Sequence, residues 1–308
     1  MTVPDSYLTY PRRKPGTDTS MFVDRRLEQV ESFTWPGGAR IAVSVVVNLQ
    51  HFPLDMGKTP FVPTGGLERF YPDIWNYTMR DYGNRVGIYR LMATFDALGI
   101  RPTVFANSDI ADRYPVLIED IDSRGWEIAA SGRSMGQLHH SGLSESEERS
   151  LIKTSIERLQ KASSRPVRGW ASPAGHQSPR TLDLLAEAGV DYVTDFVNDE
   201  LPFPLSTANG PMTALPVGTE LSDVRLIVQQ HHSTAEYAAE VMAAHAFLRQ
   251  EAVKSGRLLT LSVTPWIMGQ AHRTVGFETM LAKLQADGET SFMDCASVLD
   301  GWRARKTD

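Results

Sequence analysis

Apolar residues along most of this chain follow two alternating patterns, one typical of buried strands and the other of amphipathic helices. The run IAVSVVV at residues 41–47 is rich in β-branched residues and does not alternate with polar ones. Such a run indicates a strand that is covered on both faces, as in a parallel sheet. Residues 86–99 then place apolar side chains at helical spacing and end on Gly99, which predicts a helix closed by glycine.

The change from strand to helix recurs down to the end of the chain. Pro115 and Gly125 bound one predicted helix, and Ser144 with Glu147 forms a capping box that opens another. Repeated strand–helix units produce parallel strands, so we expect an α/β fold. No glycine-rich nucleotide-binding loop follows any of the predicted strands. We therefore expect a distorted (β/α) barrel rather than an open sheet. Further strands are predicted at 102–107, 126–130, 167–171, 191–195, 257–263 and 291–294, and further helices at 115–125, 144–162, 178–189, 233–253 and 277–288.

Two stretches lack a clear period. Residues 1–40 are rich in Pro, Arg, Gly and Thr and end in the turn-forming WPGGAR, so we interpret them as an extended arm before a single barrel domain at 41–308. Residues 52–82 form a long irregular stretch, and loops of this length are usually functional. Its aromatic side chains either line a pocket or pack between subunits, and we expect this stretch and the arm to help form a homo-oligomer. These aromatic residues are Phe70, Tyr71, Trp75, Tyr77 and Tyr82.

Composition narrows the class of protein. The chain has 308 residues, a formal net charge of −6 and no cluster of five or more Lys and Arg residues, which argues against a groove for nucleic acid. Its single cysteine, Cys295, excludes an internal disulfide framework and a cysteine-built zinc site. The first residues lack the apolar core of a signal peptide, and no apolar run reaches the roughly 18 residues of a membrane span. We therefore expect a cytoplasmic protein that acts on a small molecule, without nucleic-acid or membrane partners.

Polar or turn-forming residues follow five of the predicted strands. In (β/α) barrels the site is built from residues just after the carboxyl ends of the strands. The segments concerned here are 48–51, 131–133, 170–173, 195–202 and 264–266. Because each of them follows a strand, we expect them to surround one pocket at the carboxyl-terminal face of the barrel.

Several segments carry a resemblance to a known family. They run from WPGGARIAVSVVVNLQHF through RGWEIAASG and RPVRGWASPAG to TPWIMGQAHR, and so extend from about Trp35 to the end of the chain. In this order they resemble the polysaccharide deacetylase (NodB-homology) superfamily, in particular its branch of metal-independent, PuuE-type allantoinases and related cyclic-amide hydrolases. The resemblance implies a barrel of the NodB type and the hydrolysis of a carbon–nitrogen bond.

The resemblance also implies where catalytic residues would lie. Deacetylating members use an Asp pair after the first strand, one as base and one as metal ligand, with further metal histidines and an Arg that orients the base. Matched position by position, the Asp pair falls on Gln50 and His51, and the first metal histidine falls on Ser131. The Arg falls on Ala171 and the late histidine on Thr264. Because hydroxyl groups are poor zinc ligands, we expect a site without metal or other cofactor.

His51 and Ser131, with Gln50 beside them, form the predicted catalytic group. An imidazole with a pKa near 6.5 can act as a general base at neutral pH, although His51 is equally compatible with a purely structural hydrogen bond at a strand end. Ser131 precedes Gly132, where backbone amides can converge. Ser131 is therefore a nucleophile, a hydrogen-bond donor to substrate, or a residue that only fills space.

A pair of adjacent histidines follows in the next loop, at His139 and His140. Neighbouring side chains on an extended chain point apart, so we expect no more than one of them to face the pocket. A different metal site would need His51, one histidine of this pair and a carboxylate such as Asp55. The predicted substrate-binding residues are Arg133, Trp170, Ser172, Asp199, Thr264, Trp266 and His272.

Three functions are compatible with these residues. The first is a metal-independent hydrolase of a non-peptide carbon–nitrogen bond in a small amide, cyclic imide or ureide. The second is a catalytically silent homologue that binds a ligand or partner, and the third is a pocket retooled for a lyase or isomerase reaction that needs one base. Because Gln, Ser and Thr at the replaced positions still form hydrogen bonds, we favour the hydrolase.

Overall fold

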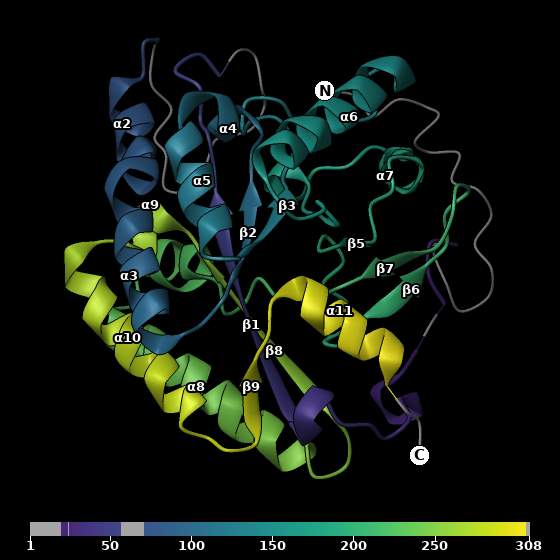
Figure 1. The fold of residues 1–308 in the computed structure, drawn as a ribbon, viewed down its shortest axis with the longest axis vertical. Coiled ribbons are helices and arrows are strands. Elements are labelled where there is room, and N and C mark those ends of the chain that lie inside the picture. Colours follow the sequence, from purple (N-terminus) through teal and green to yellow (C-terminus); the bar gives the residue numbers. More distant parts are fainter. Residues whose placement is uncertain (1–19, 24, 57–70, 306–308) are drawn as a thin grey trace.

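A curled, mostly parallel sheet forms the centre of the molecule (Figure 1). The computed structural model describes residues 20–23, 25–56 and 71–305. In this part of the chain the strands follow the order β6-β7-β5-β4-β3-β2-β1-β8, and β9 pairs with β1. The strands are β1 Ile41–Leu49, β2 Thr103–Ala106, β3 Glu127–Ala130, β4 Gly169–Trp170, β5 Tyr192–Val193, β6 Phe203–Leu205, β7 Met212–Ala214, β8 Arg257–Val263 and β9 Thr290–Phe292.

Every described strand pair is parallel except β6 with β7. The carboxyl ends of β1 to β5 and of β8 therefore meet at one edge of the sheet. The described strands do not close into a ring, since β6 and β8 lie at opposite ends of the order. The expected α/β fold of the distorted-barrel type is thus confirmed, in the form of a curled half-barrel.

Strand β1 connects the largest part of the sheet. Residues 41–47 pair with β8, residues 46–49 pair with β2, and residues 41–43 pair with β9. All of its residues except Asn48 are buried. A strand with partners on both edges and helices or loops on both faces has no polar side, which explains why its sequence lacks alternation.

The helices pack in groups around the sheet. Helices α3, α8 and α10 lie along one flank, and α4, α5 and α6 form a neighbouring group (Figure 1). The predicted capping box of Ser144 and Glu147 is confirmed at the start of α6. The helices are α2 Ile74–Tyr82, α3 Ile88–Leu98, α4 Asp109–Arg113, α5 Pro115–Ser123, α6 Glu145–Ala162, α7 Thr181–Glu187, α8 Thr234–Glu251, α9 Pro265–Met268, α10 Ala271–Gln285 and α11 Cys295–Ala304, with short turns η1 Leu27–Gln29, η2 Pro36–Gly38, η3 Gly83–Gly87, η4 Pro173–Gly175 and η5 Val224–Gln229.

Part of the stretch that was expected to be irregular is helical. The Asp73 carboxylate accepts from the Asn76 amide at 3.0 Å and caps α2, which continues through the π-helical turn η3 into α3. The prediction of a loop over all of 52–82 is therefore wrong. The reason is that α2 exposes the apolar Ile74 and Trp75 and buries the charged Arg80. An ordinary amphipathic helix buries its apolar side chains and exposes its charged ones.

Several boundaries also differ from the prediction. Helix α10 begins at Ala271, before the predicted 277, and α7 begins at Thr181, after the predicted 178. The Ser178 hydroxyl donates to the buried Glu148 carboxylate at 2.6 Å and accepts from the Arg180 amide at 3.0 Å, just before the helix. Strands β6 and β7 were not predicted because each has three residues, and α11 was not predicted because Gly301 interrupts its helical pattern.

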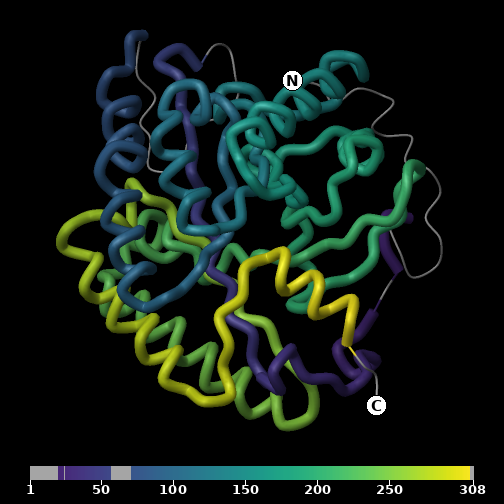
Figure 2. The backbone as a smooth tube through the Cα atoms, viewed as in Figure 1, coloured from purple at the N-terminus to yellow at the C-terminus, as the bar shows by residue number. Residues whose placement is uncertain are grey.

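The described part of the predicted arm lies beside α11, at the carboxyl-terminal end of the chain (Figure 2). The ring of Phe33 packs edge-on against Trp35, with centroids 5.1 Å apart, and against Trp302 of α11 at 5.3 Å. Phe33 and Trp35 are both buried. Residues 1–19 lie outside the described residues, and the domain division at residue 40 stays a prediction.

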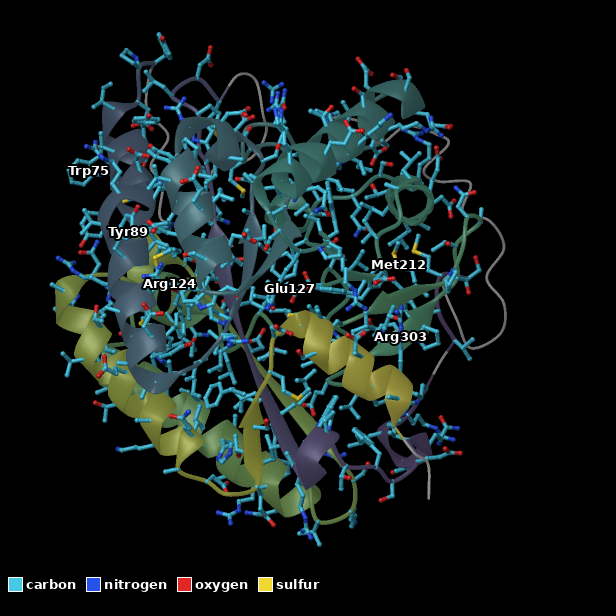
Figure 3. All side chains as sticks on the ribbon, viewed as in Figure 1. Trp75, Tyr89, Arg124, Glu127, Met212 and Arg303 are labelled. Atoms are coloured by element: carbon cyan, nitrogen blue, oxygen red, sulfur yellow. The ribbon has the colours of Figure 1, made fainter. Side chains whose placement is uncertain are left out.

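The amino-terminal edge of the sheet is occupied by structural contacts. Near the start of β3, the buried Glu127 carboxylate (Figure 3) accepts from the Thr103 and Tyr192 hydroxyls, each at 2.8 Å, and from the Ala296 amide at 2.9 Å. These bonds attach α11 to the sheet. Because they occupy the amino-terminal edge, the opposite edge is the one available for a functional site. None of the described helices has the length and apolar character needed to cross a bilayer.

Candidate functional site

An asparagine connects the ends of three neighbouring strands at the carboxyl-terminal edge. The Asn107 side chain, just after β2, accepts from the His51 backbone amide at 2.8 Å. Its amide nitrogen donates to the carbonyl oxygen of Ser131, just after β3. Asn107 is completely buried, so these bonds are protected from water. Two of the three residues predicted to be catalytic, His51 and Ser131, are therefore held by their backbone atoms on either side of one side chain.

His51 is buried, with 5% of its surface exposed. Its backbone is fixed on both sides, because its carbonyl oxygen also accepts from the Met135 amide at 2.9 Å. Burial lowers the pKa of the His51 imidazole, and the positive charge of Arg113 lowers it further, against the opposing effect of Asp109 and Asp81. The ring is therefore neutral at pH 7 and can accept a proton.

Gln50 and Asn48 fix the end of β1 to its neighbours. The carbonyl oxygen of Gln50 accepts from the Asn84 side chain at 3.0 Å, and Gln50 is half-buried. The Asn48 side chain donates to the Ser262 hydroxyl of β8 at 2.8 Å. These contacts determine where His51 leaves the strand.

Ser131 lies where β3 ends, and 9% of its surface is exposed. Its backbone amide donates to the Ala106 carbonyl at 2.8 Å, which continues the pairing with β2. Gly132 follows with φ of +61°, and a Cβ at this position would stand 2.5 Å from Cγ of Pro173. Only glycine allows the chain to turn here, directly after Ser131.

Of the adjacent histidines, His139 is buried and His140 is exposed. His139 Nδ1 lies 3.3 Å from an oxygen of Glu148 in α6, and both side chains are almost inaccessible to solvent. His140 Nδ1 accepts from the Gly142 amide at 3.1 Å, on the outside of the loop. The two side chains thus point apart, as expected for neighbours on an extended chain, and that one of them faces a pocket stays a prediction.

Trp170 and Ser172 are linked to a buried acid. Trp170 Nε1 donates to the Ser172 hydroxyl at 3.1 Å, and the Ser172 amide donates to Asp195 at 2.8 Å. Gln177 donates to the other oxygen of Asp195 at 2.6 Å. Burial raises the pKa of Asp195, although the hydrogen bonds from Ser172 and Gln177 and the charge of His139 oppose this effect. The tryptophan itself is fully buried.

Thr264, at the end of β8, binds a second buried acid. Its backbone amide donates to Asp223 Oδ2 at 2.6 Å. Oδ1 of Asp223 and the hydroxyl of Tyr237 are both buried without a hydrogen-bond partner among the described residues. Burial raises the pKa of Asp223 to about 7, in opposition to the hydrogen bonds from Thr264. Asp223 can therefore exist in both protonation states near neutral pH.

Trp266 stacks on a buried cation. The Arg80 guanidinium of α2 lies 5.1 Å from the Trp266 ring centroid and 4.8 Å from that of Phe52. Burial lowers the pKa of Arg80 to about 10, which leaves it cationic at pH 7. The unpredicted helix α2 thus brings a positive charge next to Phe52, the neighbour of His51 in the chain.

Three predicted substrate-binding residues lie in other surroundings. Arg133 forms an ion pair with Asp109 at 3.1 Å. Asp199 forms an ion pair with Arg25 and accepts from the backbone of its own loop. His272 is exposed in the first turn of α10.

The residues at this edge do not fit a zinc ion. Among residues 20–23, 25–56 and 71–305, no three His, Cys, Asp or Glu side chains lie close enough together to hold a metal. The positions to which the resemblance assigns metal ligands include His51, Ser131 and Thr264, which supply one imidazole and two neutral hydroxyls. We therefore assign no chemical step to a metal.

Asn107 and Glu148 were not among the site residues predicted from the sequence. Asn107 ends a predicted strand, which was a usable signal at a carboxyl-terminal edge. Glu148 belongs to a helical turn rich in glutamate, where an exposed position is the ordinary expectation. Asp223 had only its position in a loop to distinguish it.

Comparisons with known proteins agree with this fold. A family model described as polysaccharide deacetylase matches residues 77–193. A Schizosaccharomyces pombe protein, named provisionally as a polysaccharide deacetylase, is 22% identical over 309 residues, which cover 90% of this chain and 94% of the relative.

Two solved structures illustrate the similarity. The PuuE allantoinase has a TM-score of 0.76 and 23% identity, over 88% of this chain and 92% of that one. A Mycobacterium smegmatis protein, also named provisionally as a polysaccharide deacetylase, has a TM-score of 0.76 and 23% identity, over 89% and 94% of the two chains. At this level of identity the likeness establishes the fold. The chain is therefore similar to polysaccharide deacetylases over residues 77–193, and it shares its overall fold with the two solved structures.

Proposed function

We propose that the protein is a metal-independent hydrolase of a carbon–nitrogen bond in a small amide, cyclic imide or ureide. The observation that carries the proposal is the bridge of Asn107 between His51 and Ser131. It fixes the backbone of these two residues, which carry an imidazole and a hydroxyl, at the carboxyl-terminal edge, where barrels of this kind place their sites. The similarity to an allantoinase, which acts on a cyclic ureide, supports this substrate class.

In this proposal His51 is the general base. It takes a proton from a water molecule, whose oxygen attacks the carbonyl carbon of the substrate. Burial keeps the ring neutral and ready to accept that proton at pH 7. Gln50 lies next to it and completes the proposed catalytic group.

Ser131 is proposed to hydrogen-bond the substrate, with attack by its own hydroxyl as the alternative that a variant can test. Thr264 and Ser172 supply further polar contacts, while Trp170 and Trp266 form apolar walls. Arg80 provides a positive charge suited to a substrate oxygen that becomes negative during the reaction. This combination of few polar groups and aromatic walls suits a small, flat molecule.

The proposal is tested by incubating the purified protein with allantoin, succinimide and an N-acetylglucosamine trimer, with products identified by mass spectrometry. We expect ring opening by addition of one water to allantoin or succinimide, insensitive to a chelator, and no loss of acetyl groups from the trimer. Acetate release from the trimer would contradict the proposal in favour of a conventional deacetylase. Binding without turnover of the cyclic compounds would favour a catalytically silent homologue, and elimination or isomerisation without water would favour a lyase or isomerase.

A further inference from the structure

A second imidazole lies near the same edge of the sheet, and the proposed function as stated makes no use of it. His139 belongs to the loop after β3 and is 1% exposed. Its neighbour His140 is exposed, so the loop does not bury histidines in general. The burial of one polar ring of this pair needs a physical reason.

Two contacts fix the orientation of the His139 ring. Nδ1 lies 3.3 Å from Glu148 Oε1, and the ring packs edge-on against Trp170, with centroids 5.5 Å apart and planes at 86°. Glu148 in turn accepts from the Ser178 hydroxyl at 2.6 Å and from the Thr181 hydroxyl at 2.5 Å. A carboxylate bound in this way holds the proton of the imidazole on Nδ1 and leaves Nε2 for another partner.

Nε2 of His139 faces the turn at the end of β3. A Cβ built on Gly132 would stand 3.6 Å from Nε2 of His139 and 2.5 Å from Cγ of Pro173. Gly132 follows Ser131 directly, so the second nitrogen of His139 lies beside the backbone that carries a proposed substrate contact. Among the described residues, Nε2 of His139 has no hydrogen-bond partner.

Three charged side chains lie at the His139–Glu148 pair. They are Glu148 itself from α6, Asp195 from the segment after β5, and Arg180, whose guanidinium is 3.7 Å from Glu148. Burial raises the pKa of Glu148, but the hydrogen bonds from His139, Ser178 and Thr181 outweigh burial and leave that pKa below its usual value. Glu148 is therefore ionised at neutral pH, and its carboxylate faces Nδ1 of His139.

His51 and His139 thus stand in opposite surroundings. Burial lowers the pKa of His51 and keeps that ring neutral, whereas His139 is paired with an ionised carboxylate. Two titratable groups in such different environments are suited to opposite steps of one reaction.

We propose that His139, oriented by Glu148, is the general acid that protonates the leaving nitrogen; this inference rests on the proposed function. Water oxygen bonds to the carbonyl carbon while one water proton passes to His51. The carbon–nitrogen bond then breaks, its electron pair stays on nitrogen, and nitrogen takes the proton from Nε2 of His139. Transfer of the proton from His51 to His139 through solvent restores the enzyme.

The test compares His139→Gln with His140→Gln, a matched control one residue away, on allantoin and succinimide. We expect His139→Gln to lower kcat by about 10² to 10⁴ and to abolish the fall of kcat/KM at alkaline pH that loss of an acid produces. We expect His140→Gln to stay within twofold of wild type. Turnover of His139→Gln within threefold of wild type, with the alkaline limb intact, would overturn the inference.

Glu148→Gln tests the positioning role and covers the case in which His139→Gln does not fold. The neutral side chain keeps a hydrogen-bond acceptor but loses the charge, so the alkaline limb of kcat/KM should move to lower pH. An unmoved limb would contradict the role of Glu148. Nitrogen NMR of the wild-type ring gives an independent readout: the neutral ring should carry its proton on Nδ1, and a proton on Nε2 would overturn the inference.

These outcomes separate the two proposals. If wild type cleaves none of the cyclic compounds, the proposed function itself fails. If wild type cleaves them and His139→Gln does so equally well, the proposed function stands and only the assignment of His139 fails.

Discussion

His51 is held by its backbone rather than by its ring. The amide donates to Asn107 at 2.8 Å and the carbonyl accepts from Met135 at 2.9 Å, so neither bond depends on the imidazole. His51→Ala should therefore keep the fold while it lowers turnover by about 10² to 10⁴, as loss of a positioned base does. Steady-state kinetics together with the melting temperature check this result. Unchanged turnover would remove His51 as the base.

The pH dependence gives a second test of His51. Because burial lowers the pKa of this ring, the acidic limb of kcat/KM in wild type should lie below pH 6.5, the ordinary value for histidine. A rate profile from pH 4.5 to 9 measures this limb. A limb above pH 6.5 would mean that the ring is stabilised in its charged form and would contradict the assignment.

The contribution of Asp223 to the free energy of unfolding decreases as pH rises, whereas that of an acid with a lowered pKa increases. Burial raises its pKa to about 7, whereas the unfolded carboxyl titrates near 3.9. The folded chain therefore binds more protons between about pH 4 and pH 7, and this contribution to the unfolding free energy is lost as pH rises through that range. A difference of about three pKa units corresponds to about 4 kcal/mol at most.

Asp223→Asn should remove this dependence. Urea denaturation at pH 5 and pH 8 measures the loss of stability between the two conditions, and we expect the loss to be smaller in the variant than in wild type. Asp223→Asn and wild type with equal losses would show that Asp223 titrates as an ordinary acid in the folded protein.

At the residue scale, the sequence predicts where the candidate site residues lie better than it predicts which side chains they contact. His51, Ser131 and Thr264 lie at the edge where a strand-end argument expects them, because parallel strands bring their carboxyl ends together. Their partners come from distant parts of the chain, and nothing local distinguishes a buried glutamate such as Glu148 from the exposed glutamates of the same helix turn.

At the scale of elements, the contact between η3 and α9 determines where Trp266 lies. A Cβ on Gly87 would stand 2.1 Å from the Pro265 carbonyl oxygen, a distance that no side chain can tolerate. Gly87→Ala should therefore displace α9 and lower the unfolding free energy by about 1–3 kcal/mol or more. Turnover should fall as well, because α9 follows Thr264 directly.

Gly288→Ala is the matched control for Gly87→Ala. An added Cβ at Gly288 would meet nothing within 4 Å, so stability should change by less than about 0.5 kcal/mol. Urea denaturation of both variants checks the comparison, and equal stabilities would contradict the close packing of η3 on α9.

The elements that were predicted from sequence are those with a buried face and a clear boundary residue. Strand β1 has an unbroken apolar run, and α6 has its capping box. Helix α2 lacks such a face because its apolar residues Ile74 and Trp75 are exposed. Strands β6 and β7 are too short to show a period, and only their pairing with the rest of the sheet defines them.

At the scale of the whole molecule, large apolar and aromatic side chains of α2, η3 and α3 are exposed. Trp75, Val86 and Tyr89 are 59%, 37% and 42% exposed (Figure 3 labels Trp75 and Tyr89). The sequence predicts a homo-oligomer that uses the arm of residues 1–40 and the aromatic stretch from Phe70 to Tyr82. Trp75 belongs to this stretch, and Val86 and Tyr89 follow it, so exposed side chains of this kind offer a surface on which a second copy would pack.

Light scattering coupled to size exclusion tests this prediction. Wild type at micromolar concentration should have a mass above that of one chain, and Trp75→Glu with Tyr89→Glu should restore the monomer mass. Phe247→Glu, on the exposed side of α8, should leave the mass unchanged. A wild-type monomer would contradict the prediction.

We propose that this edge of the sheet hydrolyses a carbon–nitrogen bond without a metal. The most direct test is the kcat/KM for allantoin and succinimide of protein stripped with a chelator, with the metal content of the same sample measured by elemental analysis. We predict full activity at less than about 0.05 metal ions per chain and no gain when zinc is added back. Activity that disappears with the metal and returns with stoichiometric zinc would contradict the account.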